Sequence, residues 1–206
     1  MILPLTPKQF GAAPATSAHW SRLPMASATP EVRFWLQRPG ALTAGLRELG
    51  QLDLTVINQA VGWPSQAEQQ ALGLIGVRGA RIREIQMAVG GQVCIVARSV
   101  LSLAAWRGSW RALRGLGHRP LADLLYDDPH VKRSHFESAR LLHPERLAKL
   151  AGHLGAPDLA RARQALWARR SVFWRQGQAL LVTECFLPVF WEIVLQNARQ
   201  RCTIAR

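Results

Sequence analysis

Two glycine-containing turns, each between two runs of strand-forming residues, constrain the fold of this chain more than any other feature. One pair of runs spans residues 81–98 and turns at Gly90-Gly91, and the other spans 169–187 and turns at Gln176-Gly177. A two-residue turn that contains glycine between such runs is typical of a β-hairpin. The sequence therefore predicts an antiparallel sheet built from hairpins.

Helical patterns precede and separate these hairpins. Thr29-Pro30-Glu31 predicts a helix start, with threonine as the N-cap, proline at the first helical position and an acid in the first turn. Helical periodicity also marks 42–49, 103–116 and most of 141–167. Strands that are grouped in hairpins and separated by helices indicate an α+β fold with an antiparallel sheet.

The length of 206 residues fits a single domain with a short appended arm. We expect residues 1–18 to be a flexible N-terminal arm and residues 19–206 to form one domain. A domain of this size can bury about 70% of its unfolded surface, which leaves room for a closed ligand pocket. The most apolar stretch, 179–195, is interrupted by two glutamates and a proline, so no membrane span is expected.

The chain is strongly basic, with 26 lysines and arginines against 13 aspartates and glutamates. Only three of these cations are lysines, and the arginines are dispersed along the chain. A nucleic-acid-binding arm usually shows blocks of basic residues interleaved with aromatic ones. Nucleic acid is therefore not expected as a partner, whereas a small carboxylate is a candidate.

The cysteines and histidines give no sign of a metal site or a disulfide framework. The three cysteines form no CxxC pair, and the histidines show no metal-binding spacing. Cys94 and Cys185 lie in apolar strands, where we expect them to be packed rather than nucleophilic. We expect no metal, a reducing compartment and a cytoplasmic location.

The first hairpin predicts a pair of facing arginines. With Gly90 and Gly91 as the loop residues, Arg83 lies opposite Arg98, and period-two alternation places both on an otherwise apolar face. Like charges in such positions repel each other, and burying even one unpaired guanidinium costs several kcal/mol. A negative group is therefore expected between or above them.

The second hairpin predicts a buried carboxylate. Glu184 lies in the middle of a strand that is mostly apolar on both faces, and the register places it opposite Arg169. In a structural interpretation, Arg169 pairs with Glu184, while Arg83 and Arg98 turn to the rim or pair with Glu84 and other acids. In a functional one, the two arginines of the first hairpin bind the carboxylates of a small dianion, and Glu184 contacts a polar atom at its far end. The patterns by themselves leave both interpretations open.

Four short blocks lie in and between the hairpins. They are Ile82-Arg83-Glu84-Ile85 leading to Ala97-Arg98, Leu116-Gly117-His118-Arg119-Pro120-Leu121, the segment from Leu166 to Ser171, and the segment from Gly177 to Pro188. In their order and spacing these blocks resemble the chorismate lyase (chorismate–pyruvate lyase) family over roughly residues 80–190. The resemblance implies a highly twisted antiparallel sheet with helices, in which helical flaps close over a buried pocket.

The resemblance also implies a reaction. The family converts chorismate to 4-hydroxybenzoate and pyruvate without metal or cofactor, as the first step of ubiquinone biosynthesis. The expected partner is thus a small dianionic substrate, chorismate, and the expected state is a monomer. The alternative is a non-catalytic effector-binding domain of the same fold that binds a small carboxylate, because fold alone does not determine function. The segment 141–165 is longer than the family pattern and is expected to be a helical insertion.

Five residues match the family's ligand contacts. Arg83 matches the arginine that holds the ring carboxylate, and Glu184 matches the carboxylate near the 4-hydroxyl. Leu121 matches a residue whose backbone contacts the ligand, and Leu42 falls loosely at a contact in the first flap. Arg98 matches a second pocket arginine, which we expect at the enolpyruvyl carboxylate. Arg83 and Glu184 are the expected catalytic residues, with Glu184 either removing the ring proton or holding the hydroxyl.

Overall fold

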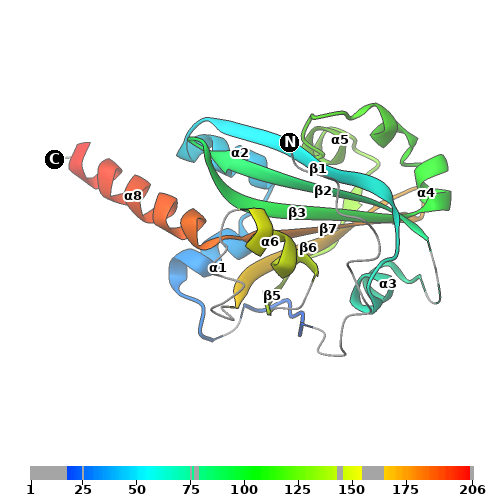
Figure 1. Ribbon diagram of the computed structural model, residues 1–206, viewed down its shortest axis with the longest axis horizontal. Helices are drawn as coiled ribbons and strands as arrows, with labels where there is room; N and C mark the ends of the chain where they lie inside the picture. The colour runs from blue at the N-terminus through cyan, green and yellow to red at the C-terminus, as the bar shows by residue number, and fades with distance from the viewer. Residues whose placement is uncertain are drawn as a thin grey trace.

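A computed structural model describes residues 18–24, 26–74, 76, 79–142, 146–154 and 165–204. Within these ranges the chain forms a seven-stranded antiparallel sheet of order β1-β2-β3-β7-β6-β4, with β5 also paired to β6 (Figure 1). The strands are β1 (Leu52–Gly62), β2 (Ala80–Val89), β3 (Gln92–Ser102), β4 (Lys132–Arg133), β5 (Glu137–Leu141), β6 (Leu166–Arg175) and β7 (Gln178–Phe186). The predicted α+β fold with an antiparallel sheet is confirmed.

Both predicted hairpin turns are present. Gly90 and Gly91 join β2 to β3 with φ angles of 56° and 80°. Gln176 and Gly177 join β6 to β7 with φ angles of 50° and 74°. Positive φ at both central residues matches the right-handed twist of the flanking strands, which explains the glycines at these positions.

The helices are α1 (Pro30–Gln37), α2 (Leu42–Leu49), α3 (Gln66–Leu72), α4 (Leu103–Arg107), the 3-10 helix η2 (Arg111–Gly115), α5 (Ala122–Tyr126), α6 (Arg146–Leu154) and α8 (Pro188–Ile204). The predicted start of α1 is confirmed, because Oγ1 of Thr29 accepts a hydrogen bond from the backbone N–H of Val32 at 3.3 Å. The single helix predicted over 103–116 is instead divided into α4 and η2, since α4 ends at Gly108.

Two predicted segments lie mostly outside the described residues. Of the N-terminal arm expected over 1–18, only residue 18 is described. Of the helical insertion expected over 141–165, the described part contains α6. α6 packs on β3, β5, β6 and β7 through a cluster that includes Leu141, Leu147, Ala151 and Cys185.

The described helices cover both faces of the sheet (Figure 1). α1, α2 and α8 pack on one face around Met87 and Phe186, and α4, η2 and α5 cover the adjoining part of that face around Leu101 and Phe173. α3 and α6 lie on the opposite face. The sheet is therefore buried on both sides, and each polar strand residue must meet a partner or a cavity.

The pairing of β2 with β3 differs from the predicted one. A β-bulge at Cys94 lies close to the turn, and beyond it Arg98 pairs with Glu84 while Arg83 pairs with Ser99. The prediction that Arg83 faces Arg98 is therefore wrong. The physical reason is that one extra residue in a strand moves every later side chain to the other face of the sheet.

The turn at Gln176 generates a stability prediction. A residue with a Cβ atom pays roughly 1–2 kcal/mol in the left-handed region, and asparagine tolerates that region better than glutamine. We expect Gln176→Asn to raise the free energy of unfolding by about 0.5–1 kcal/mol, measured by urea denaturation. Gln92→Asn, an exposed position just after the other turn, is the matched control and should give no gain. Equal effects of the two substitutions would contradict the prediction.

Candidate active site

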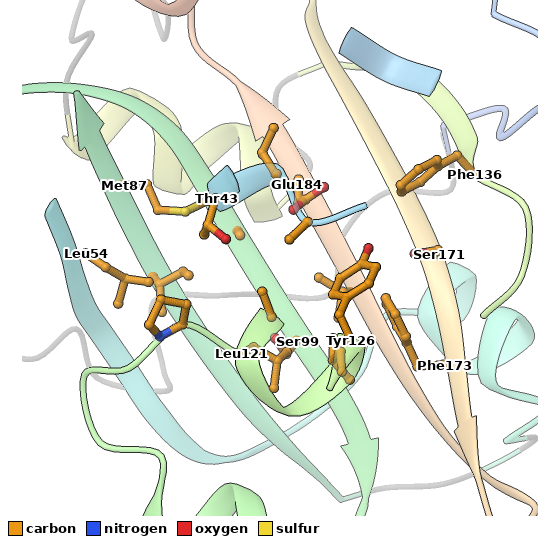
Figure 2. Close-up of a pocket in the computed structure, with 18 residues that line it drawn as sticks. Thr43, Leu54, Met87, Ser99, Leu121, Tyr126, Phe136, Ser171, Phe173 and Glu184 are labelled. Carbon is orange, nitrogen blue, oxygen red and sulfur yellow. The ribbon is translucent and has the colours of Figure 1, made fainter. Parts of the chain in front are cut away.

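A cavity lies between the sheet and the helices that cover the α2 and α5 side (Figure 2). Its floor is formed by residues of β1, β2, β3, β6 and β7, and its cover by the start of α2 and by α5 with the residues before it. Most of the lining is apolar. The polar side chains that line it are Thr43, Ser99, Tyr126, Ser171 and Glu184. An apolar cavity with a few polar groups is typical of a small-molecule site.

Arg83 lies beside this cavity as a buried cation with open hydrogen-bonding capacity. It projects from the same face of the sheet as Ser99, its cross-strand partner, which lines the cavity. The residue is 8% exposed, and its Nη2 donates to the backbone carbonyls of Gly117 and Arg119 at 2.9 and 3.1 Å. Its Nε and Nη1 are buried and have no hydrogen-bond partner among the described residues.

No described carboxylate compensates the charge of Arg83. Burial lowers the pKa of its guanidinium from the ordinary value, and no neighbouring acid acts in the opposite direction. A buried guanidinium in this state is costly unless an anion approaches it. The arrangement therefore favours binding of a carboxylate, whose two oxygens match two N–H donors of an arginine.

Glu184 lies on β7 in the cavity wall and is also held by the protein. Nε of Arg169 donates to its Oε2 at 2.5 Å, in the cross-strand pairing predicted from the sequence. Arg169 is 1% exposed, and its Nη1 donates to the carbonyls of Trp35 and Arg38 at the end of α1, at 3.0 and 3.1 Å. One carboxylate oxygen of Glu184 is thus fixed, while the residue still faces the cavity. The structural interpretation of this residue is confirmed, and the functional one stays a prediction for a residue that lines the cavity.

Tyr126, on α5, lines the cavity near this end and was missed by the sequence analysis. Its hydroxyl donates to the carbonyl of Gly40, just before α2, at 2.8 Å and accepts from Nη1 of Arg133 at 3.1 Å. Burial is the main cause that raises the pKa of Tyr126, and the charge of Glu184 adds to it. It is the single tyrosine of the chain and lies five residues after Leu121, which is the signal that could have marked it.

The two predicted leucine contacts also reach the cavity. Leu42 is the first residue of α2, and Leu121 is the N-cap of α5. Both are buried and both line the cavity from the covering side. The structure therefore brings Leu42, Leu121 and Glu184 together around one cavity, with Arg83 beside it.

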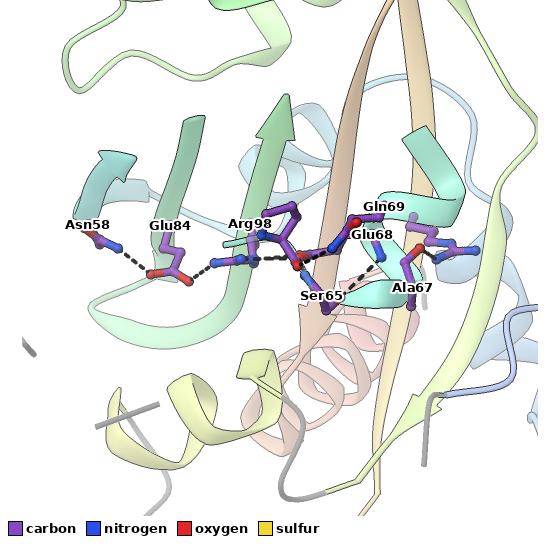
Figure 3. Close-up of polar contacts among 9 residues, drawn as sticks. Asn58, Ser65, Ala67, Glu68, Gln69, Glu84 and Arg98 are labelled. Carbon is purple, nitrogen blue, oxygen red and sulfur yellow. Dashed lines mark hydrogen bonds and ion pairs between the residues drawn. The ribbon is translucent and has the colours of Figure 1, made fainter. Parts of the chain in front are cut away.

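Arg98 is placed elsewhere, on the opposite face of the sheet (Figure 3). It is 2% exposed and donates to both oxygens of Glu68, at 2.6 and 3.3 Å, and to Glu84. Glu84 also accepts from Nδ2 of Asn58 at 2.9 Å, and Glu68 completes the capping box of α3 with Ser65. Arg98 thus ties α3 to β2 and β3.

The expectation that Arg98 binds a ligand carboxylate is not supported by this placement. Burial by itself would lower the pKa of Arg98, but the charges and hydrogen bonds of Glu68 and Glu84 outweigh it and raise that pKa. The side chain is already neutralised by the protein's own acids. This agrees with the structural interpretation, in which Arg98 pairs with Glu84.

Three other features of the described part of the chain concern metal binding, cysteine reactivity and membrane crossing. No group of three or more histidine, cysteine, aspartate or glutamate side chains there is placed to hold a metal ion. Burial is the main cause that raises the pKa of the Cys94 thiol to about 12, so this cysteine is a poor nucleophile near neutral pH. No described helix combines the length and the apolar character that crossing a membrane requires.

The fold and the site define a class: an α+β protein with a largely apolar small-molecule cavity, a carboxylate in its wall and an unneutralised arginine beside it. The sequence profile of the chorismate lyase family matches residues 15–195. The chain belongs to the chorismate lyase family.

Curated relatives agree with this assignment. A protein of Bordetella avium named probable chorismate pyruvate-lyase is 47% identical over 169 residues, which is 81% of each chain. A Pseudomonas fluorescens protein named probable chorismate pyruvate-lyase 1 is 41% identical over 176 residues, or 85% of this chain and 92% of its own.

Solved structures with a similar chain course include the effector domain of PhnF from Mycobacterium smegmatis. Its TM-score is 0.48 at 12% identity, covering 72% of this chain and 89% of that one. The ligand-binding domain of a GntR-family transcriptional regulator from Bordetella bronchiseptica has a TM-score of 0.45 at 12% identity, covering 68% and 86%. These values are too low to inform function.

The Arg98 network generates a second stability prediction. Removing one member of a buried ion-pair network leaves its partners charged and unpaired, which typically costs about 3–5 kcal/mol. We expect Arg98→Met to lower the free energy of unfolding by about that amount in urea denaturation. Arg47→Met, at an exposed position in the last turn of α2, should cost less than about 1 kcal/mol. An Arg98→Met loss as small as that of the control would show that the network is not stabilising.

Proposed function

We propose that this chain is a chorismate lyase, which converts chorismate to 4-hydroxybenzoate and pyruvate. The observation that carries the proposal is Arg83, a buried guanidinium beside an apolar cavity, two of whose nitrogens have no partner among the residues that the structure describes. Such a group favours an aromatic or ring carboxylate as ligand, because the ring suits the apolar walls and the carboxylate suits the guanidinium. Membership of the chorismate lyase family and the names of the relatives supply the substrate.

The positions of Arg83 and Glu184 suit a ring substituted at opposite ends. Arg83 on β2 pairs with Ser99 on β3, Ser99 pairs with Val182 on β7, and Glu184 follows two residues later. Two strand spacings and two residues of offset give a Cα–Cα separation of about 12 Å in a regular sheet. The two side chains project from the same face, so the space between them can take one six-membered ring.

In the proposed binding mode, Arg83 holds the ring carboxylate and Glu184 contacts the hydroxyl at C4. The reaction removes the hydrogen at C4 as a proton, and its electron pair forms the third ring double bond while the C3–O bond breaks. The leaving enolpyruvate takes up a proton at its methylene carbon and becomes pyruvate. Atoms and electrons balance without an oxidant, and aromatisation drives the step. The chain's task is to orient the substrate and exclude water.

Glu184 has two possible roles in this proposal, which its substitution distinguishes. As a general base it takes the C4 proton directly, and Arg169 holds it in position at Oε2. As an anchor it only accepts a hydrogen bond from the 4-hydroxyl, and the proton leaves by another route. Both roles are compatible with a carboxylate that is fixed at one oxygen and faces the cavity.

Substitution of Arg83 tests the proposed function. Loss of a charge-assisted, two-point interaction is worth about 1.5–3 kcal/mol or more, so we expect Arg83→Met to lower kcat/KM for chorismate by roughly 10- to 100-fold. Formation of 4-hydroxybenzoate by chromatography, and of pyruvate by a coupled assay, measures the rate. Arg47→Met, exposed and away from the cavity, should match the unsubstituted chain. An unsubstituted chain that binds chorismate without consuming it would favour a non-catalytic binding domain.

Substitution of Glu184 separates its two roles. Glu184→Gln keeps the shape and the hydrogen-bonding length but cannot take up a proton at neutral pH. We expect kcat to fall by about 10²- to 10⁴-fold if Glu184 is the base, and KM to rise with a smaller change in kcat if it is an anchor. Circular dichroism checks that the variant folds, since Arg169 loses its charged partner. Unchanged kinetics would remove Glu184 from the site.

A further inference from the structure

Arg98 lies on the opposite face of the sheet, so it is not placed to bind the second carboxylate of the proposed substrate. Chorismate carries it on the enolpyruvyl group, joined through oxygen at C3. The C3 substituent leaves the ring from its side, between the ends that Arg83 and Glu184 would hold. A binding group for it should therefore lie in a side wall of the cavity.

Thr43 is an unsatisfied polar side chain in such a wall. It is 6% exposed, and its Oγ1 is buried with no hydrogen-bond partner among the described residues. Figure 2 shows its side chain directed into the cavity, on the side of Leu54 and Met87. A buried hydroxyl without a partner is unusual and costly, and a ligand oxygen in the cavity would satisfy it.

The same wall contains the N-terminal end of an eight-residue helix. α2 begins at Leu42, and its N-cap, Ala41, offers no side chain to the backbone N–H groups of the first turn. The first turn contains no acidic residue. These N–H groups have no partner within the helix, and the helix dipole places partial positive charge on them. Ala41, Leu42 and Thr43 all line the cavity, so this end of α2 borders the ligand space.

We propose that the Thr43 hydroxyl and the first-turn N–H groups of α2 bind the enolpyruvyl carboxylate of the substrate. The inference rests on the proposed function and deepens it. It assigns the second carboxylate of the substrate to uncharged hydrogen-bond donors. The hydroxyl donates one hydrogen bond and the helix end supplies others, as helix N-termini do for small anions. Arg83 keeps the ring carboxylate.

If Thr43 binds the enolpyruvyl carboxylate, its loss should weaken binding of the substrate but not of the product. The carboxylate keeps its charge throughout the reaction, so a group that binds it contributes equally to the ground state and the transition state. Loss of that group raises KM and leaves kcat nearly unchanged. The product 4-hydroxybenzoate lacks the enolpyruvyl group, so its affinity should not depend on Thr43.

Substitution of Thr43 by valine tests the inference. Valine has nearly the same shape and removes only the orphan hydroxyl, so the fold should be kept. We expect Thr43→Val to raise KM for chorismate about tenfold or more, with kcat within about twofold and with the inhibition constant of 4-hydroxybenzoate unchanged. Thr43→Ser, which keeps the hydroxyl, should stay near the unsubstituted chain. Thr55→Val, the same change at an exposed position on β1, should have no effect.

Three results would overturn the inference. A KM for Thr43→Val equal to that of Thr55→Val would show that the hydroxyl does not contact the substrate. An equal loss of affinity for chorismate and 4-hydroxybenzoate would place Thr43 at the ring or its carboxylate instead. If the unsubstituted chain does not consume chorismate, the proposed function fails and this inference fails with it, whereas the first two results leave the proposed function intact.

Discussion

A bulge of one residue at Cys94 sets which side of the sheet each polar residue of β2 and β3 meets. Beyond the bulge, Arg98 shares a face with Glu84, and Arg83 shares a face with Ser99 and the cavity. Side chains alternate along a strand, and the pairing of β2 with β3 is regular beyond this bulge, so the assignment holds to the far end of the pair. This single irregularity places Arg98 in the ion-pair network with Glu68 and Glu84, and Arg83 beside the cavity.

The two buried guanidiniums of the first hairpin differ in how their positive charge is compensated. Arg98 is surrounded by carboxylates of two other elements and makes the sheet and α3 one unit. Within the described part of the chain, Arg83 has only backbone carbonyls as partners, both at Nη2, and its Nε and Nη1 are unsatisfied. Proteins tolerate such unsatisfied charge at functional sites, where the rest of the fold supplies the stability and a ligand completes the interaction.

The cover of the cavity is held by groups that also belong to the site. Arg169 joins Glu184 to the end of α1, and Tyr126 joins α5 to the turn before α2 through Gly40. The polar end of the cavity is therefore connected to the end of α1 and to the turn before α2. Because these hydrogen bonds cross between elements that are distant in sequence, the shape of the cavity depends on the whole fold being formed.

Local patterns were sufficient to predict the two hairpins, the helix that starts after Thr29 and one ion pair. The turns at Gly90-Gly91 and Gln176-Gly177 follow from the residues that tolerate positive φ, and the pairing of Arg169 with Glu184 follows from counting back from the second turn. Three residues that the family resemblance named as ligand contacts, Leu42, Leu121 and Glu184, line one cavity in the structure.

By itself, the sequence determined the antiparallel hairpins, the helix that starts after Thr29, and the family. Tertiary structure alone decided the face of Arg98, since a bulge leaves no mark in the alternation of residue types, and Cys94 looks like any other apolar strand residue. It also decided the parts played by Thr43 and Tyr126 in the cavity wall. Their neighbours come from distant parts of the chain, so only the assembled packing reveals which polar atoms are left without a partner.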